Sequence, residues 1–131
     1  PVRLIISGGS MSADWAILTP VTSTVIGAWI PLSSHPTQRG TRVIAAGFAP
    51  TTDSSRSEEP GETPPSRGLM YDPDCVVITP TSQPARSDCA AKKGASGGAI
   101  LRRTASGSVR VAGVISAGDG TSVSYFIPLT G

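Results

Sequence analysis

The sequence predicts an all-β protein, either a barrel or a sandwich. Short runs rich in Val and Ile alternate with stretches of Gly, Pro, Ser and Thr, which is the pattern of strands separated by turns. No window combines apolar residues at helical spacing with helix caps. With 15 Gly and 12 Pro among 131 residues, long helices are disfavoured as well. These three observations favour a closed or stacked β-architecture.

Eight apolar runs are the expected strands, and turn residues separate them. In chain order they are Val2–Ile6, Trp15–Leu18, Val25–Ile30, Arg42–Phe48, Cys75–Ile78, Ala99–Leu101, Val109–Ile115 and Val123–Leu129. The first run begins directly after Pro1 and reads as a strand already under way. Since neither an initiator Met nor a signal peptide stands in front of it, we interpret the N-terminus as a cut, made by processing or by truncation.

The segment 51–68, TTDSSRSEEPGETPPSRG, differs from the rest of the chain. It has no large apolar side chain and is filled with Pro, Ser, Glu and Gly. Such a composition buries too little surface to offset the entropy of ordering the chain. We therefore expect a long exposed loop between two strands, which is a tolerated insertion rather than a functional element.

Charge and composition exclude two classes of partner. The formal net charge is only +2, from 11 basic and 9 acidic residues, and aromatic residues make up 5% of the chain. Nucleic-acid-binding domains usually combine clustered Lys and Arg with stacking rings, so no nucleic-acid partner is expected. The apolar runs are too short to span a bilayer, so no membrane partner is expected.

Cys75 and Cys89 are the two cysteines of the chain. Neither lies near a histidine and they form no C-x-x-C pair, so the sequence indicates no metal site and no cofactor. Two interpretations remain open, a pair of buried free thiols and a disulfide. A disulfide across this loop would remove roughly 3 kcal/mol of unfolded-chain entropy. We favour the disulfide, which implies an oxidising compartment.

The stretch GASGG, residues 94–98, places Ser96 between glycines and fits two catalytic patterns. As G-x-S-x-G it is the nucleophile elbow of α/β-hydrolases, which needs a helix after the serine and a histidine later in the chain. Here a strand-like run follows Ser96, and the one histidine, His35, precedes it. The elbow interpretation fails on both points. The second pattern is G-x-S-G-G in an all-β chain.

Four segments, taken in order, resemble the chymotrypsin-like serine proteases. GASGG resembles the active-site turn of that family, and Asp14 in SADWAILTP resembles the acid of its D-x-A-L segment. GTRVIAAGF at 40–48 resembles the strand that opens the second barrel. VAGVISAG at 111–118 is similar to the strand beside the primary specificity pocket. Asp14 and Ser96 follow the family's triad order of His, Asp and Ser.

The resemblance covers essentially the whole chain and implies a double β-barrel. Residues 1–34 would be the end of the first barrel and the connection between barrels, and residues 35–131 the complete second barrel. Asp88-Cys89, with the earlier Cys75, is similar to the bacterial glutamyl-endopeptidase-like branch, whose members pair these two cysteines. The HtrA-type branch has similar spacing around its serine, but the cysteine pair counts against it.

Carried over by position, the resemblance implies a serine endopeptidase that cleaves protein or peptide substrates through an acyl-enzyme. Ser96 would attack the scissile carbonyl, and the N–H groups of Gly94 and Ser96 would form the oxyanion hole. Asp14 would hold a histidine in the correct tautomer. The strand residues that would contact the substrate are Ser116, Ala117 and Gly118.

The general base is the first departure from the family pattern. The family's histidine precedes the Asp by tens of residues, in a segment outside this sequence. His35 follows Asp14 in PLSSHPTQRG, and we expect a solvated loop histidine there. The missing N-terminal half of the protease domain is therefore an expected partner, and without it Ser96 is a weak nucleophile.

Two further departures concern activation and specificity. Ala95 stands where trypsin-type members carry the Asp that receives the new N-terminal amine, so any activation must differ. The glutamyl-endopeptidase-like branch also lacks this Asp. Ile115 occupies the position of the histidine that reads glutamate in that branch, and an apolar side chain cannot donate to a carboxylate. Lys92 and Lys93 are expected to be a solvated surface pair.

Two other hypotheses stay open beside the enzyme. The absent histidine and Ala95 also suit a non-catalytic homologue that uses the barrel to bind protein or glycan. Alternatively, half of a first barrel would leave unpaired strand edges, and the chain would aggregate rather than fold alone. The favoured interpretation predicts the C-terminal portion of a secreted or periplasmic serine protease.

Overall fold

A computed structural model describes residues 1–9, 15–22, 28–50, 67–80 and 84–129. Within these ranges the chain forms eight strands and no helix, so the all-β prediction is confirmed, and no helix there could cross a membrane. The strands are β1 (Val2–Gly8), β2 (Trp15–Pro20), β3 (Arg42–Pro50), β4 (Arg67–Thr79), β5 (Ala85–Ser87), β6 (Ala99–Arg103), β7 (Val109–Gly118) and β8 (Ser124–Pro128).

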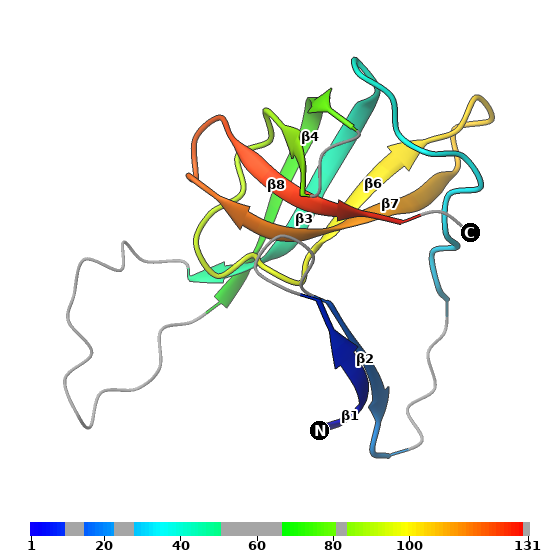
Figure 1. Cartoon of the computed structure of the whole chain (residues 1–131), viewed down its shortest axis with the longest axis vertical. Coiled ribbons are helices and arrows are strands. Elements are labelled where there is room, and N and C mark those ends of the chain that lie inside the picture. Colours follow the sequence, from blue (N-terminus) through cyan, green and yellow to red (C-terminus); the bar gives the residue numbers. More distant parts are fainter. Residues whose placement is uncertain (10–14, 23–27, 51–66, 81–83, 130–131) are drawn as a thin grey trace, which may run out of the picture.

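Six of the strands close into an antiparallel barrel in the order β3-β4-β5-β8-β7-β6 (Figure 1). Strand β3 closes it, because it pairs with β4 along one edge and with β6 along the other. Closure leaves none of these six strands with an open edge. The segment between β5 and β6, which carries Ser96, lies at the end of the barrel where β7 finishes.

Alternate residues of the barrel strands fill its interior. Val43 and Ala45 on β3, Ile100 on β6, Ile115 on β7 and Phe126 on β8 are each at most 2% exposed. The alternation follows from the two-residue period of a strand, which sends successive side chains to opposite faces. Several alanines fill the spaces between these larger side chains.

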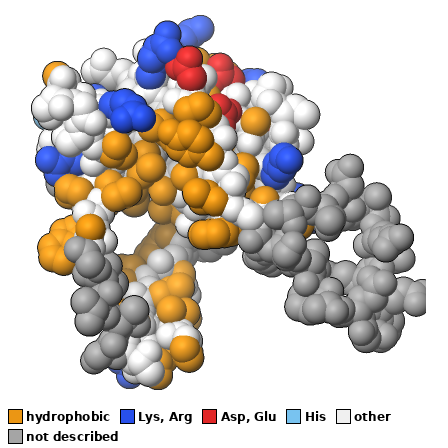
Figure 2. Space-filling view, turned by 180° about the vertical axis from the view of Figure 1, so that it is seen from behind, with side chains coloured by type: hydrophobic (Ala, Val, Ile, Leu, Met, Phe, Trp, Pro, Cys, Tyr) orange, Lys and Arg blue, Asp and Glu red, His pale blue; other side chains and the backbone are white. Residues whose placement is uncertain are grey.

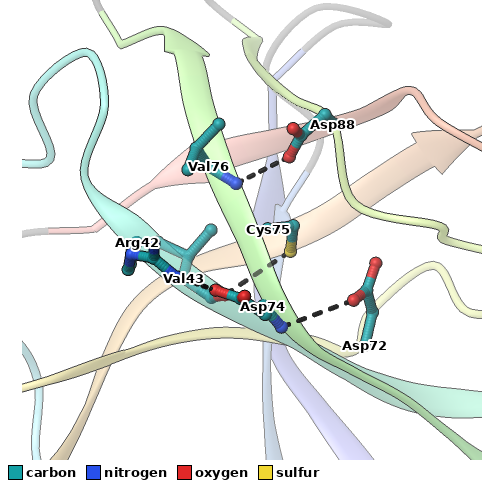
Figure 3. Close-up of polar contacts among 7 residues, drawn as sticks. All are labelled: Arg42, Val43, Asp72, Asp74, Cys75, Val76 and Asp88. Carbon is teal, nitrogen blue, oxygen red and sulfur yellow. Dashed lines mark hydrogen bonds and ion pairs between the residues drawn. The ribbon is translucent and has the colours of Figure 1, made fainter.

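Two buried cysteines fasten β4 to the segment that leads to Ser96. Cys75 and Cys89 form a disulfide, as predicted. Next to it, the Asp88 carboxylate accepts a hydrogen bond from the Val76 N–H (2.6 Å), and the Asp88 N–H donates to the Val76 carbonyl (3.2 Å) (Figure 3). The side chain and the backbone of Asp88, together with the disulfide at Cys89, therefore hold this segment against β4 before the chain turns toward Ser96.

Strands β1 and β2 form a separate antiparallel hairpin that projects from the barrel (Figure 1). The end at which β1 finishes and β2 begins is directed toward the barrel. Leu4, Ile5 and Ile6 are 54, 59 and 51% exposed. On β2 the neighbouring Ile17 and Leu18 are 52 and 53% exposed, and successive residues face opposite sides of a strand. Both faces of this hairpin are therefore apolar and open, and Figure 2 shows hydrophobic side chains along it.

The structure changes several expected element boundaries. Arg67 and Gly68, expected in the long loop, begin β4, and residues 51–66 lie outside the described residues. Strand β5 was not expected at all. The expected strand Val25–Ile30 is described only at Ala28–Ile30, which belongs to no sheet. The segment after it reaches the barrel instead, where the Ser33 N–H donates to the Val111 carbonyl (2.7 Å).

Candidate functional site

The approach to Ser96 is a tight β-turn over Lys92–Ala95. The Ala95 N–H closes it by donating to the Lys92 carbonyl (3.0 Å). Gly94 occupies the third position with a φ of 93°, while Lys93 before it has a negative φ. Positive φ at the third position alone identifies a type II turn, which glycine enters without steric cost.

A second turn of the same type follows immediately and carries the hydroxyl. The Gly98 N–H donates to the Ala95 carbonyl (2.9 Å), and Gly97 has a φ of 85°. Ser96 therefore occupies the second position of a type II turn, where its side chain is exposed. The glycines on both sides of the serine are explained by these two consecutive turns.

The amides of Gly94 and Ser96 flank the hydroxyl and are free to bind an anion. Neither donates a hydrogen bond to any residue that the structure describes. Both residues are exposed, whereas Ala95 between them is 1% exposed and fixes the turns on the barrel. Two unpaired N–H groups with one residue between them are the kind of donors that a developing negative charge on an oxygen requires.

Strand β7 holds the second turn in place. The Gly97 N–H donates to the Ile115 carbonyl, and the Ile115 N–H donates to the Gly98 carbonyl, both at 2.8 Å. The Ile115 side chain itself is buried in the core. Its side chain is therefore part of the barrel core and not of the molecular surface beside Ser96.

A β-bulge at Ser116 creates the contact between β7 and the Ser96 hydroxyl. Along the pairing with β8, β7 advances two residues, from Ile115 to Ala117, while β8 advances one. Bulged residues leave the ladder and turn their backbone groups elsewhere. The Ser116 carbonyl accepts the hydrogen bond of the Ser96 Oγ (2.8 Å).

Beyond the bulge, β7 touches the segment that precedes the turns. A Cβ added at Gly118 would lie 2.2 Å from the Ala91 carbonyl oxygen, so no larger residue fits there. The Gly120 N–H donates to the same oxygen (3.1 Å). The two segments are therefore in contact at Gly118, and no deep pocket separates them at that point.

Asp119 shapes the connection from β7 to β8. Its Oδ1 accepts hydrogen bonds from the N–H groups of Thr121, Ser122 and Val123, each at 2.9 Å. These backbone donors hold the pKa of the Asp119 carboxyl well below its usual range. Sequence reasoning missed this residue, although Asp followed by Gly is a common turn signal.

A shallow groove borders the first turn on the opposite side from β7. Its lining includes Pro50, Leu69, Met70, Tyr71 and Lys92. The Lys92 N–H donates to the Met70 Sδ (3.2 Å), which ties the start of β4 to the turn. A Cβ at Gly94 would lie 3.0 Å from the Pro50 Cδ, so the groove adjoins the free amide of Gly94.

The structure brings together Gly94, Ser96 and Ser116, whereas Asp14 lies outside the described residues. His35 is exposed, and its carbonyl accepts a long hydrogen bond (3.5 Å) from Arg102 near the start of β7. The five steps along β7 from Val111 to Ser116 span roughly 16 Å at about 3.3 Å per step. His35 is therefore near the far end of β7 from the hydroxyl.

Within the described part of the chain, no three His, Cys, Asp or Glu side chains gather as metal ligands. No family model matches the chain, and no curated protein or solved structure matches it. Function must therefore be argued from the geometry. That geometry offers an exposed hydroxyl, two free amides beside it and an adjacent strand end.

Proposed function

We propose that this chain supplies the nucleophile and the oxyanion hole of a serine endopeptidase. The observation that carries the proposal is the pair of unpaired amides at Gly94 and Ser96, on consecutive type II turns around an exposed hydroxyl. An ordinary loop serine has no need of two such turns. The resemblance of GASGG and VAGVISAG to the chymotrypsin-like family supports the same assignment.

In the proposed reaction, the Ser96 Oγ attacks the carbonyl carbon of a peptide bond. The carbonyl oxygen becomes an anion and accepts hydrogen bonds from the amides of Gly94 and Ser96. One donor of this kind typically contributes about 3 kcal/mol to stabilising the transition state. The tetrahedral intermediate then expels the amine and leaves an acyl group on Ser96, which water removes.

The proton of the Ser96 hydroxyl must pass to a base, and we assign that role to a histidine from outside this sequence. In the structure the hydroxyl donates to the Ser116 carbonyl, so the base has to replace this acceptor. Asp14 would orient the histidine. In support, β2 starts directly after Asp14, at the end of the hairpin that is directed toward the barrel.

The same proposal gives the projecting hairpin a partner. An isolated two-stranded hairpin is marginal in water, and both faces of β1 and β2 expose apolar side chains. The strands that bring the histidine would cover these faces and complete a first barrel. The disulfide is consistent with an oxidising compartment, and we infer a secreted or periplasmic enzyme.

The substrate would lie along Ser116, Ala117 and Gly118, beside the turn. Because Gly118 touches Ala91, a large side chain has no room between these two segments. We therefore expect a preference for small side chains at the cleaved residue. A preference for glutamate is not expected, since Ile115 is buried.

A non-catalytic binding protein is the second candidate function. The hydrogen bond from Ser96 to a backbone carbonyl favours it, because that hydroxyl is satisfied without a base. The two candidates differ in one property, the reactivity of Ser96. A single labelling experiment therefore separates them.

The test is to produce the chain together with its upstream coding sequence and treat the folded protein with a fluorophosphonate probe. The enzyme predicts covalent labelling at Ser96, located by peptide mass spectrometry. Ser96→Ala should abolish labelling. Ser106→Ala, at an exposed serine of the β6–β7 turn, should leave it unchanged. A folded protein without label at Ser96 would exclude the enzyme and leave the binding protein.

A further inference from the structure

Three arginines stand near the end of the barrel where β6 finishes and β7 starts. Arg102 on β6 and Arg110 on β7 are direct partners in the strand register, and Arg103 follows on β6. Directly opposed residues project from the same face, with Cβ atoms about 5 Å apart. Two permanently charged side chains therefore start from the same place on one face of the sheet, and like charges directly opposite each other weaken a sheet.

The described carboxylates do not compensate these charges. They number four, and each is engaged elsewhere. Asp74 pairs with Arg42, which is the one ion pair among the described side chains. Asp72 and Asp88 accept hydrogen bonds from backbone N–H groups of other segments. Asp119 accepts them from the N–H groups of Thr121, Ser122 and Val123 in its own connection. A like-charged pair with no counterion among the described residues breaks a local rule of sheet stability, and such exceptions concentrate at functional sites.

The surroundings of the pair suit an anion. The Arg102 Nη1 donates a long hydrogen bond to the His35 carbonyl (3.5 Å). This contact holds the guanidinium beside the segment around Leu32, which runs parallel to β7 at Val111. The adjoining β6–β7 turn presents the hydroxyls of Thr104, Ser106 and Ser108, hydrogen-bonded to one another. Residues 99–111 contain no Asp or Glu. The end of the hairpin is thus cationic and rich in donors.

We propose that Arg102 and Arg110 form a binding site for the sulfate groups of a sulfated polysaccharide. The planar fork of arginine matches tetrahedral oxyanions and binds them through two parallel hydrogen bonds. The disulfide is consistent with an oxidising, extracellular environment, in which the protein would meet sulfated polysaccharides. Nucleic acid is disfavoured because neither β6 nor β7 carries an aromatic residue on which bases would stack. This site is independent of the chemistry at Ser96.

The experiment measures binding of a fluorescent heparin octasaccharide to the 131-residue chain by anisotropy, at fixed ionic strength. Arg102→Ser with Arg110→Ser should weaken binding by about tenfold or more, since hydrogen bonds between charged groups are lost. The matched control removes two exposed charges elsewhere, Arg3→Ser with Arg39→Ser, and should change affinity by less than about threefold.

Arg110→Glu is a second variant that guards against loss of the fold. It replaces the repulsive pair by an opposite-charge pair with Arg102, so the melting temperature should stay the same or rise while octasaccharide binding is lost. Equal losses in the two double variants would overturn the proposal, as would absence of saturable binding. Tighter binding of a single-stranded RNA of equal charge would also overturn it, in favour of a nucleic-acid site.

Discussion

At the scale of single residues, Gly94 carries two constraints, a left-handed backbone conformation and contact with Pro50. Replacement by alanine should cost about 1–2 kcal/mol of unfolding free energy from the positive φ. The new Cβ would also press on the Pro50 ring from 3.0 Å and displace the amide that we assign to the oxyanion. Labelling of Ser96 should therefore fall by more than the loss of folded protein explains. Denaturant titration and the labelling rate measure the two effects.

Gly107 offers a matched control for this variant. Its φ is 83°, but a Cβ there meets no atom within 4 Å. Gly107→Ala should lose a similar amount of stability from the backbone, and the labelling rate should not change. If both variants lose labelling equally, the special role of the Gly94 amide is wrong.

Asp119 provides a prediction about pH. Its carboxyl has a lowered native pKa, so its stabilising effect is complete above the unfolded pKa of about 3.9 and is lost as pH falls through the native pKa. Asp119→Asn removes the charge and should lower the melting temperature at neutral pH. The difference from the parent should shrink progressively below about pH 4.

The control for Asp119 is Asp74, whose carboxylate forms an ion pair with Arg42 in which both side chains are exposed. Exposed pairs contribute little to stability, so Asp74→Asn should melt close to the parent at either pH. A melting difference for Asp119→Asn that is the same at neutral and acidic pH would contradict the assigned hydrogen bonds.

Part of the candidate site was predictable at this scale, and part was not. The motif GASGG predicted an unusual turn at Ser96, because two glycines beside a hydroxyl indicate positive φ. The bulge at Ser116 and the contact of Gly118 with Ala91 were not predictable. Both depend on how separate segments are aligned in the folded barrel, the bulge on the pairing of β7 with β8 and the Gly118 contact on a segment 27 residues earlier. No local sequence pattern encodes such an alignment.

At the scale of elements, the disulfide connects β4 to the segment that leads into the turns. The two cysteines are 14 residues apart in sequence and at most 3% exposed. Replacing both by alanine should lower the free energy of unfolding by about 3 kcal/mol. Reduction of the parent should produce a similar loss, and a reducing agent should not affect the double variant. An unchanged denaturation midpoint after verified reduction would contradict a stabilising role.

The strands differ in how readily they can be predicted from the sequence. Strand β3 was predicted because Arg42–Phe48 is an apolar run that contains Val and Ile and lies between turn residues. Strand β5 is only three residues, Ala85–Ser87, and too short to show a period. Its place is set by neighbours on both sides, including the buried hydrogen bond between the hydroxyls of Ser87 and Ser124 (2.6 Å). Tertiary pairing, rather than local propensity, defines such an element.

At the scale of the whole molecule, the barrel and the hairpin differ in how much of their large apolar side chains they bury. The barrel closes its own edges and buries a core. The hairpin leaves large side chains on both faces open, as at Val2 (62%), Ile5 (59%) and Ile17 (52%). Contiguous apolar surface of this kind marks an interaction site or an aggregation hazard. We therefore expect the chain alone to self-associate with rising concentration, measured by sedimentation velocity.

The hairpin can be removed to test whether it is the cause. A chain of residues 28–131 keeps every barrel strand, the disulfide and the segment that bonds to Val111. It should sediment as a monomer and melt in one cooperative transition, because β1 and β2 form a sheet of their own and pair with no strand of the closed barrel. Replacing both Ile5 and Ile17 by Lys in the full chain should also reduce self-association, as removal of the hairpin does. If the shortened chain still associates, the association is mediated instead by exposed side chains of the barrel, such as Phe48, Leu69 and Tyr71. The hairpin would then need no covering strands, and the proposed first barrel would lose its main physical support.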